Sequence, residues 1–197
     1  MILTVASFKG GVGKTTTAVH LAAYFQKKGT AVLIDGDENH SASAWARRGQ
    51  LPFPVVDARQ TAKVARQFEH VIIDTQARPS QEDLKELGDG CDLLVIPSTP
   101  DALSLDALML TVAALRSRGT DKYRILLTII PPRPSRDGEE ARGMLAEEAL
   151  PVFAAGVRRL AAFQKAALAG VVVNKVDDPR AQWAWEDYWA VGKEICE

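Results

Sequence analysis

Lys9-Gly10-Gly11-Val12-Gly13-Lys14-Thr15-Thr16 is the stretch on which the fold assignment depends. Residues 2–8 before it are mostly apolar and include β-branched side chains, which is typical of a short buried strand. Residues 15–28 after it carry apolar side chains at helical spacing, which favours a packed helix. The glycine-rich stretch therefore lies at a strand-to-helix junction.

The three glycines of this loop let the backbone turn successive N–H groups towards one anion. The following helix adds the partial positive charge of its N-terminus, so the loop suits a phosphate group. Lys14 is placed to reach the β- and γ-phosphates of a nucleotide, and the Thr15 hydroxyl is placed to complete a Mg²⁺ shell. A glycine-rich turn that only caps a helix is the alternative interpretation.

The loop departs from the ordinary phosphate-binding pattern at its first position. That pattern requires glycine at position 8, where this chain has Phe8. A second lysine, Lys9, stands at the entrance of the loop instead. A solvated lysine at a strand end is the simpler interpretation of Lys9.

Two later segments end in carboxylates. Residues 30–37 are largely apolar and end in Asp35-Gly36-Asp37, and residues 70–75 end in Asp74-Thr75. Because residues two apart on an extended segment point to one face, Asp35 and Asp37 are both expected to face the phosphates. A polar turn after the first segment, and a helix cap at Asp74, are the alternatives.

Length and composition fit one compact soluble domain. The chain has 197 residues, of which 47% are hydrophobic and 25% charged, and its formal net charge is −1. We expect residues 1–197 to form a single domain with no appended DNA-reading domain. No signal segment precedes the first strand and no apolar run approaches membrane-spanning length, so we expect a cytoplasmic protein. Cys91 and Cys196 lack metal-ligand spacing.

Helix and strand patterns alternate along the rest of the chain. Helices are predicted near residues 41–48, 58–67, 80–89, 101–117, 137–148, 160–168 and 179–195, and strands near 53–57, 92–97 and 124–130. This alternation predicts an α/β fold with a mainly parallel, doubly wound sheet and helices on both faces. A ligand should lie beyond the carboxyl ends of the strands, where residues 9–15, Asp37 and Asp74 fall.

The loop and the two acid-ending segments resemble those of the ParA/MinD group of deviant Walker ATPases, and most closely those of ParA-like partition or cargo-positioning proteins. The similarity runs nearly end to end. It implies ATP and Mg²⁺ as cofactors and a slow ATP hydrolase that a partner protein stimulates. It also implies a homodimer that forms on ATP binding, in which Lys9 contacts the nucleotide of the other subunit.

The resemblance assigns roles to individual residues. The expected nucleotide-binding residues are Gly10, Gly11, Val12, Gly13, Lys14, Thr15 and Thr16, and those expected near magnesium are Thr15, Asp35 and Asp74. Lys9, Lys14 and Asp37 are the expected catalytic residues, with Asp37 orienting the attacking water. The chain departs from the family after both acids, with Glu38-Asn39 where Pro-Gln is usual, and with Thr75-Gln76-Ala77-Arg78-Pro79 in the second switch segment.

The resemblance also implies an adenine contact and a DNA surface. Pro131 and Pro132 are candidates for a wall against the base, although consecutive prolines also stiffen turns. Non-specific DNA binding in the ATP state is expected at Arg158, Arg159, Lys175 and Arg180, within a second half rich in basic pairs such as Arg116 and Arg118. Solvated charges are the alternative. Such binding would place the protein on the nucleoid.

The sequence leaves the cargo open. A plasmid, a chromosome or a protein organelle such as the carboxysome is compatible with the resemblance, linked by a ParB-like or other adaptor. A MinD-like membrane-bound regulator is disfavoured, because residues 184–197 are acidic and poor in lysine. A nitrogenase-type iron protein would need cluster cysteines, and a dethiobiotin synthetase would need a small-substrate pocket.

Two further interpretations concern the switch and the last helix. A nucleotide-gated scaffold with little hydrolysis is an alternative to the enzyme, given the unusual residues after Asp37. Trp183, Trp185 and Trp189 crowd the last predicted helix, where they are expected to dock that helix on the sheet rather than to mark a partner surface.

Overall fold

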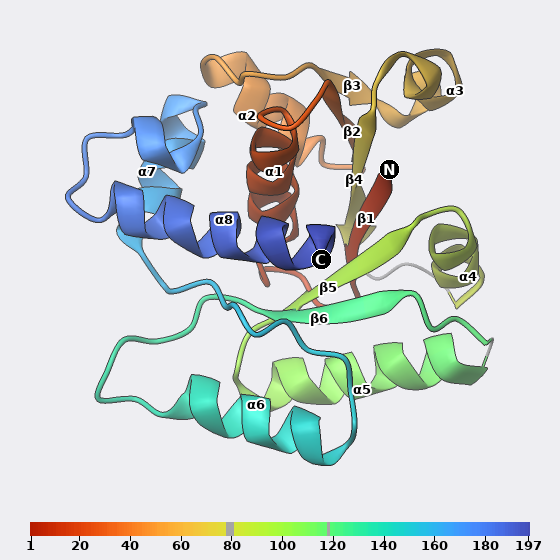
Figure 1. Cartoon of the computed structure of the whole chain (residues 1–197), viewed down its shortest axis with the longest axis vertical. Helices are drawn as coiled ribbons and strands as arrows, with labels where there is room; N and C mark the ends of the chain where they lie inside the picture. Colours follow the sequence, from red (N-terminus) through yellow and green to blue (C-terminus); the bar gives the residue numbers. More distant parts are fainter. Residues whose placement is uncertain (78–80, 118) are drawn as a thin grey trace.

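The computed structural model describes residues 1–77, 81–117 and 119–197, and its centre is a six-stranded sheet (Figure 1). The strands lie in the order β3-β2-β4-β1-β5-β6, and every neighbouring pair is parallel. Their bounds are β1 Ile2–Ser7, β2 Ala31–Gly36, β3 Val55–Asp57, β4 His70–Ala77, β5 Leu93–Ser98 and β6 Tyr123–Leu127. The predicted α/β fold with a parallel sheet is confirmed.

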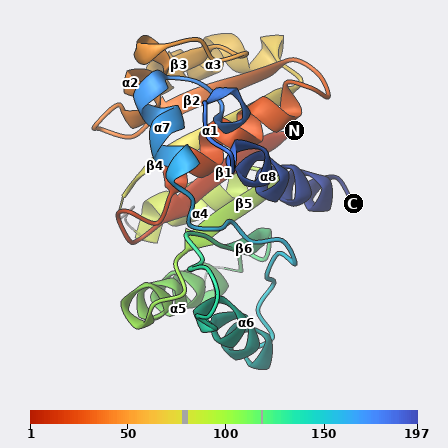
Figure 2. The same ribbon diagram turned by 90° about the vertical axis from the view of Figure 1, so that its left-hand side faces the viewer.

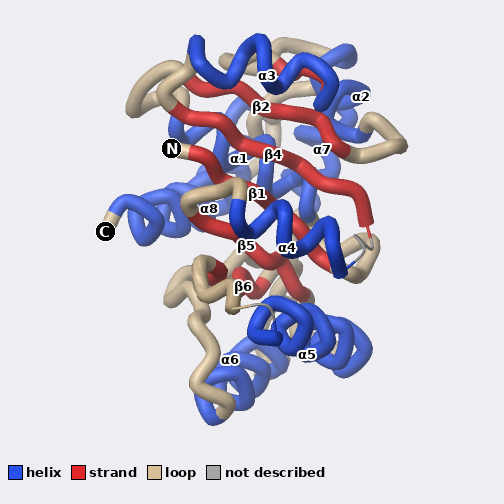
Figure 3. The backbone as a smooth tube through the Cα atoms, turned by 90° about the vertical axis from the view of Figure 1, so that its right-hand side faces the viewer, coloured by secondary structure: helices blue, strands red, loops and turns tan. Residues whose placement is uncertain are grey.

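Helices cover both faces of this sheet. Figure 2 shows α1, α2, α7 and α8 on one face, and Figure 3 shows α3 and α4 on the other. Their bounds are α1 Lys14–Phe25, α2 Ser41–Arg48, α3 Thr61–Val64, α4 Gln81–Asp89, α5 Ala102–Ser117, α6 Asp137–Glu147, α7 Ala161–Ala169 and α8 Ala181–Cys196. Among the described residues, no helix has an apolar stretch long enough to cross a lipid bilayer.

Alternation along the strands divides the core into separate layers. Val95 of β5 packs in the large cluster that contains the buried faces of α1, α2, α7 and α8. Its neighbours Leu94 and Ile96 pack with α5 and α6 on the opposite face. Both faces of a parallel strand are buried in this way, which explains the nearly continuous apolar runs in the sequence.

The helix that follows the glycine-rich loop, α1, is held on several sides. Ten of its twelve residues are buried. Nδ1 of His20 lies 2.7 Å from the Thr16 carbonyl oxygen, and its Nε2 accepts the Val173 N–H at 3.1 Å. The ring stacks on Tyr188 of α8 with 4.9 Å between centroids, and the Tyr188 and Thr17 hydroxyls are hydrogen-bonded at 3.0 Å. These contacts fix α1 against the C-terminal helix.

Two predicted elements differ from the observed ones. Residues 58–67 form short 3₁₀ turns on either side of the single helical turn α3, not one helix. The strand predicted at 124–130 ends at Leu127, because Ile129 has a φ of 52°, which a strand does not allow. The helix predicted at 80–89 is α4. Its first predicted residue, Ser80, lies outside the described residues, as do Arg78, Pro79 and Arg118.

Replacing Gly192 in α8 by alanine is expected to destabilise the protein, although alanine favours helices by about 1 kcal/mol. The added Cβ would lie 2.5 Å from ring atoms of Tyr24, and that ring is already packed against Phe25 and Trp189. Overpacking of this kind costs about 1–3 kcal/mol. Urea denaturation of wild type and Gly192→Ala measures the difference.

The matched control is Gly143→Ala in α6. A Cβ at Gly143 meets no heavy atom within 4 Å, so this substitution should stabilise the protein by about 0.5–1 kcal/mol. Equal effects of the two substitutions would contradict the packing of α8 on Tyr24.

Candidate nucleotide site

The loop between β1 and α1 has the backbone conformation that its glycines permit. Gly11 and Gly13 have φ angles of 80° and 86°, which residues with a Cβ rarely adopt. A Cβ built at either position, or at Gly10, would meet no heavy atom within 4 Å, so the loop surface is open. The Gly13 carbonyl accepts the Thr17 N–H at 2.8 Å, which joins the loop to the first turn of α1. An open glycine loop at a helix N-terminus suits a phosphate.

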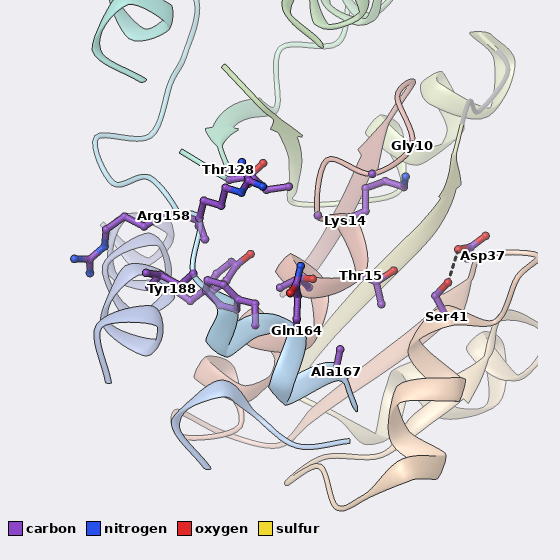
Figure 4. Close-up of a pocket in the computed structure, with 18 of the residues that line it drawn as sticks. Gly10, Lys14, Thr15, Asp37, Ser41, Thr128, Arg158, Gln164, Ala167 and Tyr188 are labelled. Carbon is purple, nitrogen blue, oxygen red and sulfur yellow. Dashed lines mark hydrogen bonds between the residues drawn. The ribbon is translucent and has the colours of Figure 1, made fainter. Parts of the chain in front are cut away.

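The loop forms one end of a cavity of about 630 Å³ (Figure 4). Four separate parts of the chain contribute to it: the loop with the start of α1, the turn after β2, the segments beyond β6, and the helices α7 and α8. The lining residues are Gly10, Gly11, Gly13, Lys14, Thr15, Thr16, Asp37, Asn39, Ser41, Thr128, Ile129, Val157, Arg158, Arg159, Leu160, Phe163, Gln164, Ala167 and Tyr188. Most of the predicted phosphate loop therefore shares one cavity with Asp37.

Val12 anchors the loop to the protein interior. Its side chain is 2% exposed, and its carbonyl oxygen accepts the Thr128 hydroxyl at 2.8 Å. Thr128 follows β6 directly and lines the cavity as well. Thr128 is not recognisable from the sequence, because no local pattern links it to a loop 116 positions earlier.

Lys14 and Asp74 are two oppositely charged groups buried near the loop. Lys14 is 8% exposed, and burial lowers its pKa against the opposing effects of Asp74 and Asp37. Asp74 is fully buried inside β4, which continues to Ala77, and within the described residues neither carboxylate oxygen has a hydrogen-bond partner. Burial raises its pKa to about 7, although the nearby Thr15 and Lys14 lower it. A buried carboxylate without a donor favours the approach of a cation or its bound water.

Asp35 and Asp37 organise the turn between β2 and α2. The buried Asp35 carboxylate accepts the N–H groups of Asp37 at 3.3 Å and Ser43 at 2.8 Å. The Asp37 carboxylate accepts the Asn39 N–H at 3.2 Å and the Ser41 hydroxyl at 3.1 Å (Figure 4). Asp37 lines the cavity, whereas Asp35 does not and is engaged in holding the turn. Magnesium binding by Asp35 stays a prediction.

Lys9 is turned towards its own chain. Its ammonium group lies 3.0 Å from an Asp101 carboxylate oxygen and 2.7 Å from the Ser104 hydroxyl, at the start of α5. Thr99 and Ser104 donate hydrogen bonds to the Asp101 carboxylate. Together with the hydrogen bond from Lys9, they hold the pKa of Asp101 well below its usual range. Lys9 does not line the nucleotide cavity. Its expected role across a dimer stays a prediction.

The end of the cavity away from the loop is formed by segments for which the sequence predicts no contact with a nucleotide base. Ile130 and residues 157–159 are joined by backbone hydrogen bonds, which place Ile129 beside Leu160 and Phe163 in the lining. Ile129 is β-branched and yet has a positive φ, a conformation that the surrounding structure must stabilise. Pairing between segments this far apart in the sequence leaves no local signal.

Pro131 and Pro132 lie elsewhere. They line a neighbouring hollow with Arg133, Arg142 and Arg158, of which Arg158 also lines the cavity that contains the loop. Their predicted contact with adenine stays a prediction.

The four basic residues predicted to bind DNA are not gathered in one place. Arg158 and Arg159 line the nucleotide cavity, and Lys175 lines another hollow behind α1. The Arg158 guanidinium lies 2.7 Å from the Asp187 carboxylate, which raises the pKa of Arg158. Arg180 is exposed and precedes α8.

Comparison with protein families matches residues 3–187 to the CobQ/CobB/MinD/ParA nucleotide-binding domain. The chain is 35% identical over 202 residues to "Maintenance of carboxysome distribution protein A" of Gloeobacter kilaueensis, with 98% of this chain and 93% of that protein covered. The chain therefore belongs to this nucleotide-binding family, and the family match covers the glycine loop and the strands β2 and β4.

Solved structures of two other proteins share the fold. An ATP complex of a McdA variant from Cyanothece has a TM-score of 0.75 at 16% identity, with 97% of this chain and 96% of that chain covered. A plasmid partition protein from Borrelia burgdorferi B31 bound to AMPPNP has a TM-score of 0.75 at 16% identity, with 98% of each chain covered.

Replacing Asp74 by asparagine is expected to stabilise the ligand-free protein at pH 8. The pKa of Asp74 is about 7 in the folded state and near 3.8 when unfolded, so the folded state binds more protons between these values. The wild type therefore loses stability as the pH rises from about 4 to about 7, by on the order of 4 kcal/mol, whereas the variant has no such group.

Urea denaturation between pH 4 and pH 8, without nucleotide or metal, measures this difference. The difference in the free energy of unfolding between Asp74→Asn and wild type should grow up to about pH 7 and then level off. A variant that is less stable than wild type throughout this range would contradict an unpartnered carboxylate at Asp74.

Proposed function

The chain belongs to the CobQ/CobB/MinD/ParA nucleotide-binding family, and on this premise we propose that it is an ATPase that dimerises on ATP and positions a cargo. The observation that carries the proposal is the open glycine loop with Lys14 at one end of a cavity, next to the unpartnered Asp74. A nucleoside triphosphate with its metal ion is the ligand that matches this arrangement of donors and charge.

The phosphates are bound by the loop and the start of α1 in this proposal. The N–H groups of residues 10–16 and the Lys14 ammonium donate hydrogen bonds to the phosphate oxygens. The negative charge of the phosphates offsets the free-energy cost of burying the Lys14 ammonium. The base lies towards Ile129, Leu160 and Phe163, which provide apolar contact at the other end of the cavity.

The residues around Asp74 fit a magnesium ion. Thr15 offers a hydroxyl ligand, and Asp74 offers a buried carboxylate that needs a donor such as metal-bound water. The ion would neutralise charge on the phosphates during phosphoryl transfer. Thr15 and Asp74 come from α1 and β4, whose positions are fixed by the sheet.

Hydrolysis requires a water molecule in line with the γ-phosphate, and Asp37 is the candidate to orient it. Asp37 lines the same cavity as Lys14 and Thr15. Its carboxylate is held by Asn39 and Ser41, so it is positioned before nucleotide binds. Positioning and charge stabilisation, and not covalent chemistry, supply the catalysis in this proposal.

Dimerisation depends on Lys9 in this proposal. The lysine must leave Asp101 and Ser104 and reach the phosphates of a second copy, where its charge favours the ATP state over the ADP state. Hydrolysis then removes the γ-phosphate and separates the two copies. A ParB-like or other adaptor protein accelerates this step.

The cargo is proposed from the relatives. The similarity to a carboxysome distribution protein over nearly the whole chain favours the positioning of a protein organelle, and the plasmid partition relative keeps DNA segregation as an alternative. In both cases the ATP dimer holds non-specific DNA, which places the protein on the nucleoid.

A nucleotide-gated scaffold with little hydrolysis is a second candidate. The observation in its favour is that Asp37 is engaged by its own turn, at the position where Glu38-Asn39 replace the usual family residues. In that case ATP would switch the dimer on, and exchange of nucleotide would switch it off.

The ATP-dependent dimer is tested by measuring solution mass with a slowly hydrolysed ATP analogue and Mg²⁺. Wild type is expected to double its mass. Lys14→Ala should lose nucleotide affinity by about 10- to 100-fold or more and stay monomeric, because it lacks the charged phosphate donor. Lys9→Ala should bind nucleotide and stay monomeric, whereas Lys63→Ala on α3 should behave as wild type.

The dimerisation mechanism would be refuted if the solution mass of the wild type stayed equal to that of one chain while nucleotide binding was saturated.

The role of Asp37 is tested by phosphate release from Asp37→Ala. The variant is expected to bind ATP and remain dimeric with ATP itself, while turnover falls by about 100-fold or more, because the attacking water is no longer oriented. The assay contains DNA and the adaptor candidate. Wild-type turnover as slow as that of the variant under these conditions would favour the scaffold instead.

A further inference from the structure

The turn between β2 and α2 surrounds the Asp37 carboxylate with hydrogen-bond donors. Asn39 donates twice to Oδ1, from its backbone N–H and from its side-chain Nδ2, each at 3.2 Å. The Ser41 hydroxyl donates to Oδ2 at 3.1 Å (Figure 4). All three residues line the nucleotide cavity. The carboxylate therefore reaches the cavity with both of its oxygens already in contact with donors.

The number of acceptor positions on this carboxylate limits what else it can bind. An ionised carboxylate has about four lone-pair positions, two on each oxygen. The two Asn39 donors fill both positions on Oδ1, whereas Ser41 fills one of the two on Oδ2. These are the donors found for the carboxylate in the part of the chain that the structure describes. One acceptor position, on Oδ2, is therefore open to a water molecule.

Two attachments restrict rotation of the Asp37 side chain. Oδ1 is held by Asn39 within the turn itself, and Oδ2 is held by Ser41, the first residue of α2. The first turn of α2 is joined to β2, because the Ser43 N–H donates to the buried Asp35 carboxylate at 2.8 Å. Rotation of the Asp37 carboxylate would break hydrogen bonds at both of its oxygens, so the open acceptor position keeps one direction.

We propose that Ser41 is a positioning residue for ATP hydrolysis. By filling one side of Oδ2, its hydroxyl leaves the attacking water one place to bind on Asp37, and this place sets the direction of the water. Without the hydroxyl, a second position on Oδ2 opens and the carboxylate loses its attachment to α2. A displacement of about 1 Å between reacting groups costs up to about 100-fold in rate. The Ser41 hydroxyl acts through Asp37 and takes no proton from the water.

This proposal rests on the role that the proposed function gives to Asp37, and it names the group that directs the carboxylate. It also gives the contacts within the turn a use in hydrolysis. The donors of Asn39 and Ser41 hold the carboxylate but leave one acceptor position open. Engagement of Asp37 by its own turn is therefore compatible with an enzyme, and not only with a scaffold.

The test measures phosphate release from Ser41→Ala at several ATP concentrations, with DNA and the adaptor candidate present. The value of kcat is expected to fall about tenfold, because a smaller share of the bound water is in line with the γ-phosphate. The KM for ATP and the ATP-dependent dimer should be kept, because the hydroxyl donates to Asp37. Ser41→Thr keeps a hydroxyl on the β-carbon and should recover most of the lost turnover.

The matched control is Ser43→Ala, the same substitution two residues further along α2. Ser43 contributes its backbone N–H to Asp35, and no hydrogen bond of its hydroxyl is found among the described residues. This variant should therefore turn over as wild type. A double variant gives a second readout. In an Asp37→Ala background, adding Ser41→Ala should change turnover by less than about twofold, because Ser41 acts only through Asp37.

The outcomes separate this proposal from the proposed function. If Ser41→Ala releases phosphate as fast as wild type while Asp37→Ala does not, the positioning role of Ser41 falls and the role of Asp37 stands. If Ser41→Ala lowers turnover equally with and without Asp37, or raises KM alone, the hydroxyl acts on the nucleotide or on the fold, and the proposal is wrong. If Asp37→Ala is as active as wild type, the roles of both residues fall.

Discussion

Burial of opposite charges at the carboxyl edge of a parallel sheet is the constraint on which this structure depends. The register pairs Asp74 of β4 with Val5 of β1 on one side and Asp35 of β2 on the other, so the carboxyl halves of three neighbouring strands meet here. Lys14 enters the same region from the first turn of α1. A lone buried charge would be strongly unfavourable, and two opposite ones without direct hydrogen bonds are only partly stabilised. In the proposed function, a metal ion and phosphates would therefore improve the electrostatics of this region.

Such a site is useful only if its parts cannot relax, and the surrounding contacts prevent relaxation. Thr128 holds the loop through the Val12 carbonyl, and His20 ties α1 to the segment at Val173 and to Tyr188. Full burial lowers the pKa of His20 to about 4, so its ring is neutral at physiological pH and its Nε2 keeps the ability to accept. The loop, the helix behind it and the C-terminal helix are therefore tied together by direct contacts, and preorganisation of this kind favours the binding of a phosphate.

Local patterns were sufficient for most of the helices and strands and for the glycine-loop end of the cavity, and insufficient for its other end. The strand before the loop, the glycines and the acid-ending strands each have a signature within about ten residues, and the parallel fold places their ends together. Ile129 and Phe163 meet only through backbone pairing of distant segments, and the positive φ of Ile129 contradicts its β-branched preference. Lys9 shows a further limit. Its residue type predicts a charge at the loop entrance, but not that Asp101 and Ser104 hold it.

The contact of Lys9 with its own chain is compatible with a switch because it is weak enough to exchange. The Lys9 and Asp101 side chains are 33% and 52% exposed, and ion pairs in such surroundings contribute about 0–1 kcal/mol. Phosphate groups carry more charge than one carboxylate, so a second copy with bound triphosphate would compete successfully for this lysine. If Lys9 left, Asp101 would keep its hydrogen bonds from Thr99 and Ser104, so no buried charge would be left without a partner. A surface pair of this kind keeps the lysine ordered near the loop entrance without preventing its transfer across an interface.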